Sequence, residues 1–142
     1  MTRNRVVLFA LVALAVCAGF VWAQDAGSAT ISAVYKTSQV QEGSSSFSMT
    51  FAVRMFNLSD NDIQIDRVKL ANPSNTSTYA TWDSVTVPAN GKVELSDDVE
   101  VGKQEYKRWK SGAPAVLYTV TRNNAGDAVA TQVQATYQPS GW

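Results

Sequence analysis

Apolar and polar residues alternate along much of this chain, and a period of two is the pattern of half-buried β-strands. The clearest run covers residues 47–55, where every second position is apolar. In that phase Phe47, Phe51 and Val53 face the core. The residues that follow, 57–62, are turn formers and end the strand.

Similar runs of Val, Thr, Tyr and Ile recur at hairpin spacing, which is typical of an all-β domain. Besides 47–55, the expected strands cover residues 31–40, 63–70, 79–87, 93–101, 116–120 and 129–137. Between Ile65 and Val68 the apolar phase slips by one residue, so a bulge near Asp66-Arg67 is expected. The segment Pro88-Ala89-Asn90-Gly91 predicts a tight hairpin turn.

Residues 102–112 interrupt the alternation. Tyr106 and Trp109 lie three positions apart among charged residues, and Gly112 follows as a natural stop. We therefore expect a short helical insert near residues 103–111. The rest of the chain contains no internal repeat, and it predicts a single antiparallel β-sandwich of immunoglobulin-like type with seven to eight strands.

The order of these elements resembles that of known exported sandwiches. An alternating strand ends in Asn at 53–57, a Ser-Asp turn and an Ile-x-Ile strand follow, and VTVPANGKVEL spans residues 85–95. Over about residues 46–120 this is similar to small immunoglobulin-like or fibronectin-III-like domains and to desiccation-related LEA/WHy-type sandwiches. The resemblance implies a binding or scaffolding sandwich without a shared catalytic site. The helical insert belongs to none of these patterns.

The first 23 residues have the order of a secretory signal peptide. Arg3 and Arg5 precede an apolar run over 6–21, and Ala23 is a suitable cleavage position. An uncleaved N-terminal anchor is the alternative, and it would be the chain's only contact with the membrane. Either way residues 24–142 form the β-sandwich domain and lie outside the cytoplasm. The predicted location is periplasmic or extracellular, and the segment looks bacterial.

Cys17 is the only cysteine, and the chain contains no histidine. Lipid attachment at Cys17 is disfavoured, because β-branched Val16 precedes it and apolar residues follow it. The exported part would then have no disulfide, no thiolate and no histidine base, so Ser-His-Asp and Cys-His catalysis are excluded. We expect no enzyme and no cofactor.

The charge balance argues against nucleic acid as a partner. Without residues 1–23 the chain keeps 119 of its 142 residues, with 10 Lys and Arg against 12 Asp and Glu. A net charge of about −2 does not supply the basic field that a dedicated nucleic-acid binder carries.

The insert contains the candidate contact residues. Trp109 is surrounded by the basic residues Lys103, Lys107, Arg108 and Lys110. A basic patch with an embedded aromatic ring can contact an anionic glycan, a lipid headgroup or an acidic protein. The alternative is an ordinary solvated surface, because Glu105 dilutes the charge. Trp82 and Trp109 would stack on sugars if exposed, whereas buried they would be core or lid residues.

Two acidic groups and two glycosylation sequons are further candidates for functional sites, but the residues around them favour structural roles. Asp60-Asn61-Asp62 lacks the Gly and Glu of a calcium loop, so a solvated turn is expected. Asp98 and Glu100 share one strand face and are expected to protect an edge strand. The sequons at Asn57 and Asn75 are attributed to turn composition.

Taken together, these features predict an exported, non-enzymatic domain that acts as a structural or protein-interaction module in the cell envelope. Its partner would be an envelope protein or a glycan. The alternative is a carbohydrate-binding module that uses exposed aromatic residues. Trp109, Lys107, Arg108, Lys110 and Trp82 are the residues predicted to make the contact.

Overall fold

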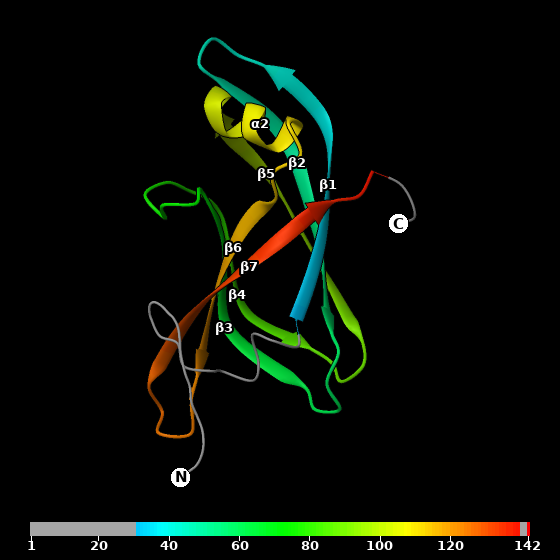
Figure 1. Cartoon of the computed structure of the whole chain (residues 1–142), viewed down its shortest axis with the longest axis vertical. Helices are drawn as coiled ribbons and strands as arrows, with labels where there is room; N and C mark the ends of the chain where they lie inside the picture. Colours follow the sequence, from blue (N-terminus) through cyan, green and yellow to red (C-terminus); the bar gives the residue numbers. More distant parts are fainter. Residues whose placement is uncertain (1–30, 140–141) are drawn as a thin grey trace. The chain divides into compact units, whose positions relative to one another are not determined.

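The computed structural model describes residues 31–139 and Trp142, so the predicted signal peptide lies outside the described residues. The chain forms seven strands and one helix (Figure 1): β1 (Ile31–Glu42), β2 (Ser46–Asn57), β3 (Ile63–Ala71), β4 (Thr78–Val87), β5 (Lys92–Gly102), α2 (Lys103–Lys110), β6 (Ala115–Arg122) and β7 (Ala128–Tyr137). The predicted all-β class is confirmed.

All seven strands belong to one sheet, in the order β4-β3-β6-β7-β1-β2-β5. Neighbouring strands are antiparallel except β1 and β7, which run parallel over Ala33–Tyr35 and Ala135–Tyr137. The expectation of wholly antiparallel pairing is therefore wrong at this one place. The reason is geometric: consecutive strands reverse direction, so the first and the seventh point the same way when they become neighbours.

The sheet curls until its two edge strands, β4 and β5, approach each other. These strands are joined by the turn at 88–91 and are in contact. The indole Nε1 of Trp82 in β4 donates a hydrogen bond of 3.2 Å to the backbone oxygen of Ser96 in β5. The structure thus has one mixed sheet that closes nearly into a barrel around the core.

The core lies on the concave face of this sheet. On β2 the core residues Met49, Phe51, Val53 and Met55 occupy every second position, as predicted, and Ala52 between them is buried as well. Phe47 is only half-buried and packs against Tyr106 of α2, with ring centroids 4.2 Å apart. The largest fully buried side chains are those of Tyr35, Phe51, Met55, Ile65, Leu70 and Leu117.

The predicted phase slip in β3 is present, but it takes a different form from the expected bulge. Ile65 and Val68 are both buried, while Asp66 and Arg67 between them are exposed. The register against β4 does not shift at this point; Ser84 across the pair adopts a φ of 56° instead. Both strands therefore change phase together.

The predicted hairpin turn after β4 is confirmed. The N–H of Gly91 donates to the oxygen of Pro88 at 3.0 Å, and Asn90 adopts a φ of 53°. A Cβ at Gly91 would lie 2.9 Å from Cγ of Pro88, so the turn requires glycine there. Asp62 accepts from the N–H of Ala89 at 2.8 Å, which connects this turn to the β2–β3 turn.

Asn57 organises the same end of the sheet from a position that is only 1% exposed. Its Nδ2 donates to the oxygens of Asn61 and Val87 at 2.7 and 3.0 Å. Its Oδ1 accepts from the N–H and the hydroxyl of Ser59 at 2.9 and 2.7 Å. Each hydrogen-bonding group of the amide thus has a partner, which burial of a polar side chain requires.

Candidate binding site around helix α2

Helix α2 connects β5 to β6 at the end of the sheet opposite these turns (Figure 1). It ends where Gly112 adopts a φ of 103°, and the N–H of Gly112 donates to the oxygen of Trp109 at 3.1 Å. A residue with a Cβ would be strained at that φ, which is why glycine ends the helix. The predicted helical insert and its stop are confirmed.

Hydrogen bonds among the side chains of Glu105, Arg108 and Trp109 fix their orientations on α2. The carboxylate of Glu105 accepts two hydrogen bonds from Arg108, at 2.9 and 2.7 Å. It also accepts one from Nε1 of Trp109, at 3.1 Å. The Glu105 side chain is only 9% exposed, so these donors replace the water that a carboxylate loses on burial.

The Trp109 side chain points into the core and is 4% exposed. Its ring centroid lies 5.6 Å from that of Tyr35, 5.7 Å from that of Phe51 and 6.5 Å from that of Tyr79. With aromatic neighbours packed around it, the indole offers no open face on which a sugar ring would stack. This placement corresponds to the alternative that Trp109 is a core residue.

Burial changes the acidity of the groups beneath α2. The pKa of Tyr35 is raised to about 12, mainly because burial disfavours the phenolate and secondarily because of the nearby Tyr137. The pKa of Tyr79 is also raised by burial, with a smaller contribution from the Glu105 carboxylate. The hydrogen bond to Glu105 raises the pKa of Arg108. The phenols therefore stay neutral, and Arg108 stays charged, under ordinary conditions.

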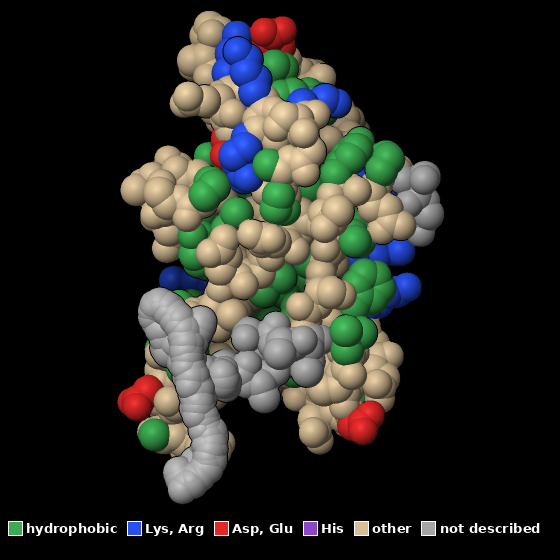
Figure 2. All heavy atoms as spheres, viewed as in Figure 1, with side chains coloured by type: hydrophobic (Ala, Val, Ile, Leu, Met, Phe, Trp, Pro, Cys, Tyr) green, Lys and Arg blue, Asp and Glu red, His purple; other side chains and the backbone are tan. Residues whose placement is uncertain are grey.

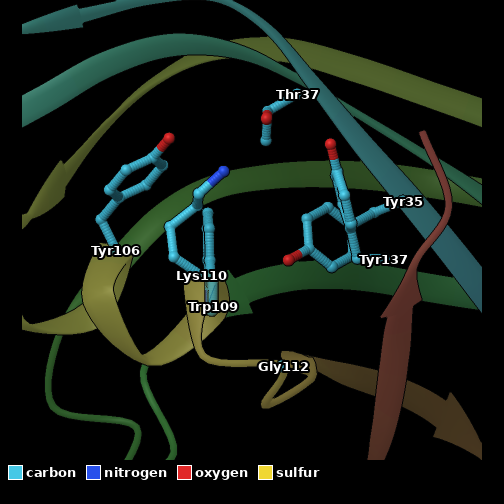
Figure 3. Close-up of a pocket in the computed structure, with 7 residues that line it drawn as sticks. All are labelled: Tyr35, Thr37, Tyr106, Trp109, Lys110, Gly112 and Tyr137. Carbon is cyan, nitrogen blue, oxygen red and sulfur yellow. The ribbon is translucent and has the colours of Figure 1, made fainter.

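A pocket opens between α2, β1 and β7. Figure 3 shows Tyr106, Trp109 and Lys110 projecting from α2, with Tyr35 and Thr37 of β1 and Tyr137 of β7 across from them. Gly112 completes the lining, and the cavity volume is about 120 Å³. Tyr137 is 46% exposed at its mouth. Four aromatic rings and one ammonium group thus surround a small, mainly apolar space.

A wider groove lies on the other side of α2, against the β3–β4 loop. Its lining includes Asn72, Pro73, Tyr79, Lys107 and Arg108, and its volume is about 700 Å³. The Asn72 amide orders the loop by accepting from the N–H groups of residues 76 and 77, at 2.8 and 2.9 Å. This groove is larger and more open than the aromatic pocket, and two basic side chains contribute to its lining.

The structure divides four of the five predicted contact residues between the two hollows on either side of α2. Trp109 and Lys110 line the aromatic pocket, and Lys107 and Arg108 line the groove. Trp82 lies on β4, is half-buried with its Nε1 bonded to Ser96, and lines neither hollow. In Figure 2, basic side chains gather at the top of the view, where α2 lies in Figure 1.

Sequence reasoning did not identify Tyr35, Thr37 or Tyr137 as contact residues, and it identified Tyr106 and Gly112 only as parts of the helical insert. Tyr35 and Tyr137 become neighbours only through the parallel pairing of the first and last strands. Their ring centroids are 5.4 Å apart. The alternation along each strand marks them as residues of one face, but no local signal predicts which strands pair.

The acidic residues considered from the sequence have structural partners. Asp60 and Asp62 accept hydrogen bonds from Asn90 and Ala89 of the neighbouring turn. On edge strand β5, Asp98 accepts from the Thr50 hydroxyl at 2.8 Å. Among residues 31–139 and Trp142, no group of three or more His, Cys, Asp or Glu side chains is placed to hold a metal ion.

No helix in the described part of the chain is both long enough and apolar enough to span a bilayer. No protein-family model matches the sequence, and no curated protein matches it either. The fold has a similar solved structure, an X-ray structure of Northeast Structural Genomics Consortium target SoR45. The similarity has a TM-score of 0.44 and 9% sequence identity, and it covers 78% of this chain and 89% of the other.

Proposed function

We propose that this protein is an exported, non-enzymatic interaction module that binds a partner protein through the aromatic pocket beside α2. The observation that carries the proposal is the pocket's combination of size and lining. A volume of about 120 Å³ suits one buried side chain, since cavities of about 150 Å³ accept a single benzene ring. Tyrosine and tryptophan are residue types typical of interaction hot spots.

The pocket favours a protein partner over an extended glycan. Sugar stacking requires exposed aromatic faces, but the Trp109 ring is packed among other aromatic rings and Trp82 is half-buried on another part of the sheet. The alternative of a carbohydrate-binding module would depend on Tyr137, the exposed ring of the pocket. A titration with cell-wall polysaccharides distinguishes carbohydrate binding from protein binding.

The non-enzymatic role and the location rest on residue types. The chain has no histidine, and its single cysteine lies at position 17 within the apolar N-terminal run. Export is inferred from the basic start and the apolar run before Ala23, whether or not cleavage follows. A periplasmic or surface-associated protein of the cell envelope is the partner that this location favours.

We also propose an immunoglobulin-like classification for the sheet. Strands β1, β2 and β5 would form one layer, and β4, β3, β6 and β7 the other. The parallel pairing of β1 with β7, which covers only three residue pairs, would then be the junction between the layers. This division agrees with a core enclosed from both sides.

The test is capture of partners from the envelope fraction by the tagged full chain. One variant combines Tyr137→Ala with Lys110→Glu at the pocket. The control combines Leu58→Ala with Lys92→Glu, which change an exposed apolar and a basic residue near the turns at the other end of the sheet. Partners lost with the pocket variant and kept with the control support the proposal, whereas equal capture contradicts it.

A parallel titration with cell-wall polysaccharides tests the alternative. Binding would be followed by tryptophan fluorescence. A saturable change that Tyr137→Ala abolishes, together with pocket-independent protein capture, would replace the protein-binding proposal with the carbohydrate one.

A further inference from the structure

One edge of β1 has no strand beside it over half of its length. β2 pairs with β1 from Ile31 to Glu42, but β7 pairs with the opposite edge only as far as Tyr35. Among residues 31–139 and Trp142, no strand pairs with that edge beyond Tyr35. Unpaired strand edges carry free N–H and C=O groups and readily accept another strand.

The direction of the backbone groups shows that Thr37 is the first residue of β1 after Tyr35 whose N–H and C=O face the open edge. The N–H of Gln138 donates to the oxygen of Tyr35 at 2.8 Å, so the backbone groups of Tyr35 face β7. This orientation repeats every second residue. The N–H and C=O of Thr37 therefore face the same open edge, whereas those of Lys36 and Ser38 face β2.

The chain does not continue β7 along this edge in its described part. Strand β7 ends at Tyr137, and the described residues directly after it, Gln138 and Pro139, belong to no strand. Trp142 lies on the outward side of the sheet, where its ring is 4.7 Å from Nζ of Lys36 and 4.5 Å from the guanidinium carbon of Arg54. The pocket, in contrast, opens on the inward side, toward α2.

The free edge and the aromatic pocket are adjacent, because Thr37 belongs to both. Side chains directly across a parallel pair lie on the same face, as Tyr35 and Tyr137 do. A residue placed across from Thr37 by an added strand would therefore enter the pocket. This is the geometry of strand addition, in which backbone bonds give affinity and a pocket selects a side chain.

We infer, building on the proposed function, that the partner binds by strand addition: an extended segment of it continues the line of β7 along β1 and places one apolar side chain in the pocket. The segment carries a carboxylate near that side chain. The only charged group in the lining is Lys110, and Lys110 forms no salt bridge with any described residue. The positive φ of Gln39 and the irregular register between Ser38 and Gln41 limit the contact to a short segment.

The probes are acetylated hexapeptides with threonine at every second position. Of the remaining positions, which would face inward, one holds Leu, Phe or Tyr and the next holds Glu or Lys. Each is titrated into the full chain and followed by NMR. Amide hydrogen exchange then reports strand addition directly. The Thr37 amide should become protected on binding, whereas the Lys36 and Ser38 amides are already protected by β2. Glu peptides should bind at least tenfold more tightly than Lys peptides, and Lys110→Glu should reverse this order.

Two changes remove the backbone bonds, and the first of them leaves the pocket itself unaltered. One is N-methylation of the peptide amide that would face β1, and the other is Thr37→Pro, whose lost N–H faces the open edge. Either should weaken binding at least tenfold. The N-methylated peptide keeps the test valid if Thr37→Pro does not fold.

The outcomes separate this inference from the proposed function. Binding that shifts Tyr137 but leaves Thr37 exchange and the N-methylated peptide unaffected overturns strand addition and retains the pocket. The absence of binding by every peptide at about 1 mM, with partner capture still dependent on the pocket, also overturns strand addition alone. If neither peptides nor captured partners depend on the pocket, both ideas fail.

Discussion

The indole Nε1 of Trp109 donates a hydrogen bond of 3.1 Å to the carboxylate of Glu105, one helical turn earlier in α2. The same carboxylate accepts both bonds from Arg108. A residue that the sequence offers as a surface contact is thereby turned toward the core, and the helix is held against Tyr35 and Phe51. The Trp109–Glu105 pair thus fixes the wall of the pocket that α2 supplies.

Glu105→Ala is expected to lower the free energy of unfolding by about 2 kcal/mol. The change leaves Nε1 of Trp109 and the Arg108 guanidinium without their acceptor, and a buried donor without a partner costs about 1–3 kcal/mol. The partial exposure of Arg108 keeps the effect below that of a fully buried ion pair. Urea denaturation measures it. Gln104→Ala, an exposed neighbour, should change stability by less than about 0.5 kcal/mol; equal effects would contradict the role of Glu105.

Asn57→Ala is expected to cost about 2–4 kcal/mol of stability. It removes four hydrogen bonds and leaves the buried oxygen of Val87, and partly buried groups of the β2–β3 turn, without these partners. Urea denaturation again provides the measurement. The matched control is Asn61→Ala, since the exposed Asn61 side chain makes no hydrogen bond within the described residues. A loss below about 1 kcal/mol for Asn57→Ala would show that the turns hold their geometry without this amide.

Stability should fall at high pH because of Tyr35. Below pH 10 the folded and unfolded states both keep the phenolic proton, so Tyr35 contributes no pH dependence. Between the ordinary pKa of 10.0 and the folded pKa of about 12, the unfolded state loses this proton and the folded state keeps it. The free energy of unfolding then decreases by up to about 1.4 kcal/mol per pH unit.

Tyr35→Phe isolates that contribution. The phenylalanine keeps the ring, and the Tyr35 hydroxyl makes no hydrogen bond to any residue of the described part of the chain. Denaturant unfolding at pH values between 10 and 12 should show a shallower decline in the variant. The raised pKa values of Tyr79 and Tyr118 would leave some decline in place. An unchanged slope would mean that Tyr35 ionises normally in the folded state.

Trp82→Phe should loosen the contact between the two edge strands. It removes the bond from Nε1 to the Ser96 oxygen and leaves most of the half-buried ring area, so about 1 kcal/mol of stability should be lost. Amide exchange should accelerate in β4 and β5 more than in the central strands β6 and β7. The control is Arg67→Ala, which removes an ion pair that is largely exposed on both sides and should change little. Uniform acceleration across the sheet would contradict a local role.

Local patterns in the sequence predict the elements of this fold well. The alternation along β2, the hairpin turn at 88–91 and the helical insert before Gly112 all depend on residues close together in the chain. A period of two, a Pro-Ala-Asn-Gly turn and a glycine stop each act within a few residues. The phase slip at Asp66-Arg67 was visible for the same reason, although its form depended on Ser84 in the paired strand.

The candidate site was only partly predictable. Lys107, Arg108, Trp109 and Lys110 were identified because they form one charged segment with an aromatic residue. Which of them faces solvent depends on Glu105. Its carboxylate accepts a hydrogen bond from Trp109, whose ring then faces inward, and also accepts hydrogen bonds from Arg108. That arrangement requires a packed core beneath the helix.

By itself the sequence determined the strand segments, the turns, the helix and the residue types available for chemistry, because these follow from short-range periodicity and composition. Tertiary structure alone decided that β1 lies beside β7, that the sheet curls into one wall, and that Tyr35, Thr37 and Tyr137 meet Tyr106, Trp109 and Lys110 around a pocket. The physical reason is that strand pairing is selected by the burial of the whole inward face. Alternation marks that face but does not say which strands become neighbours.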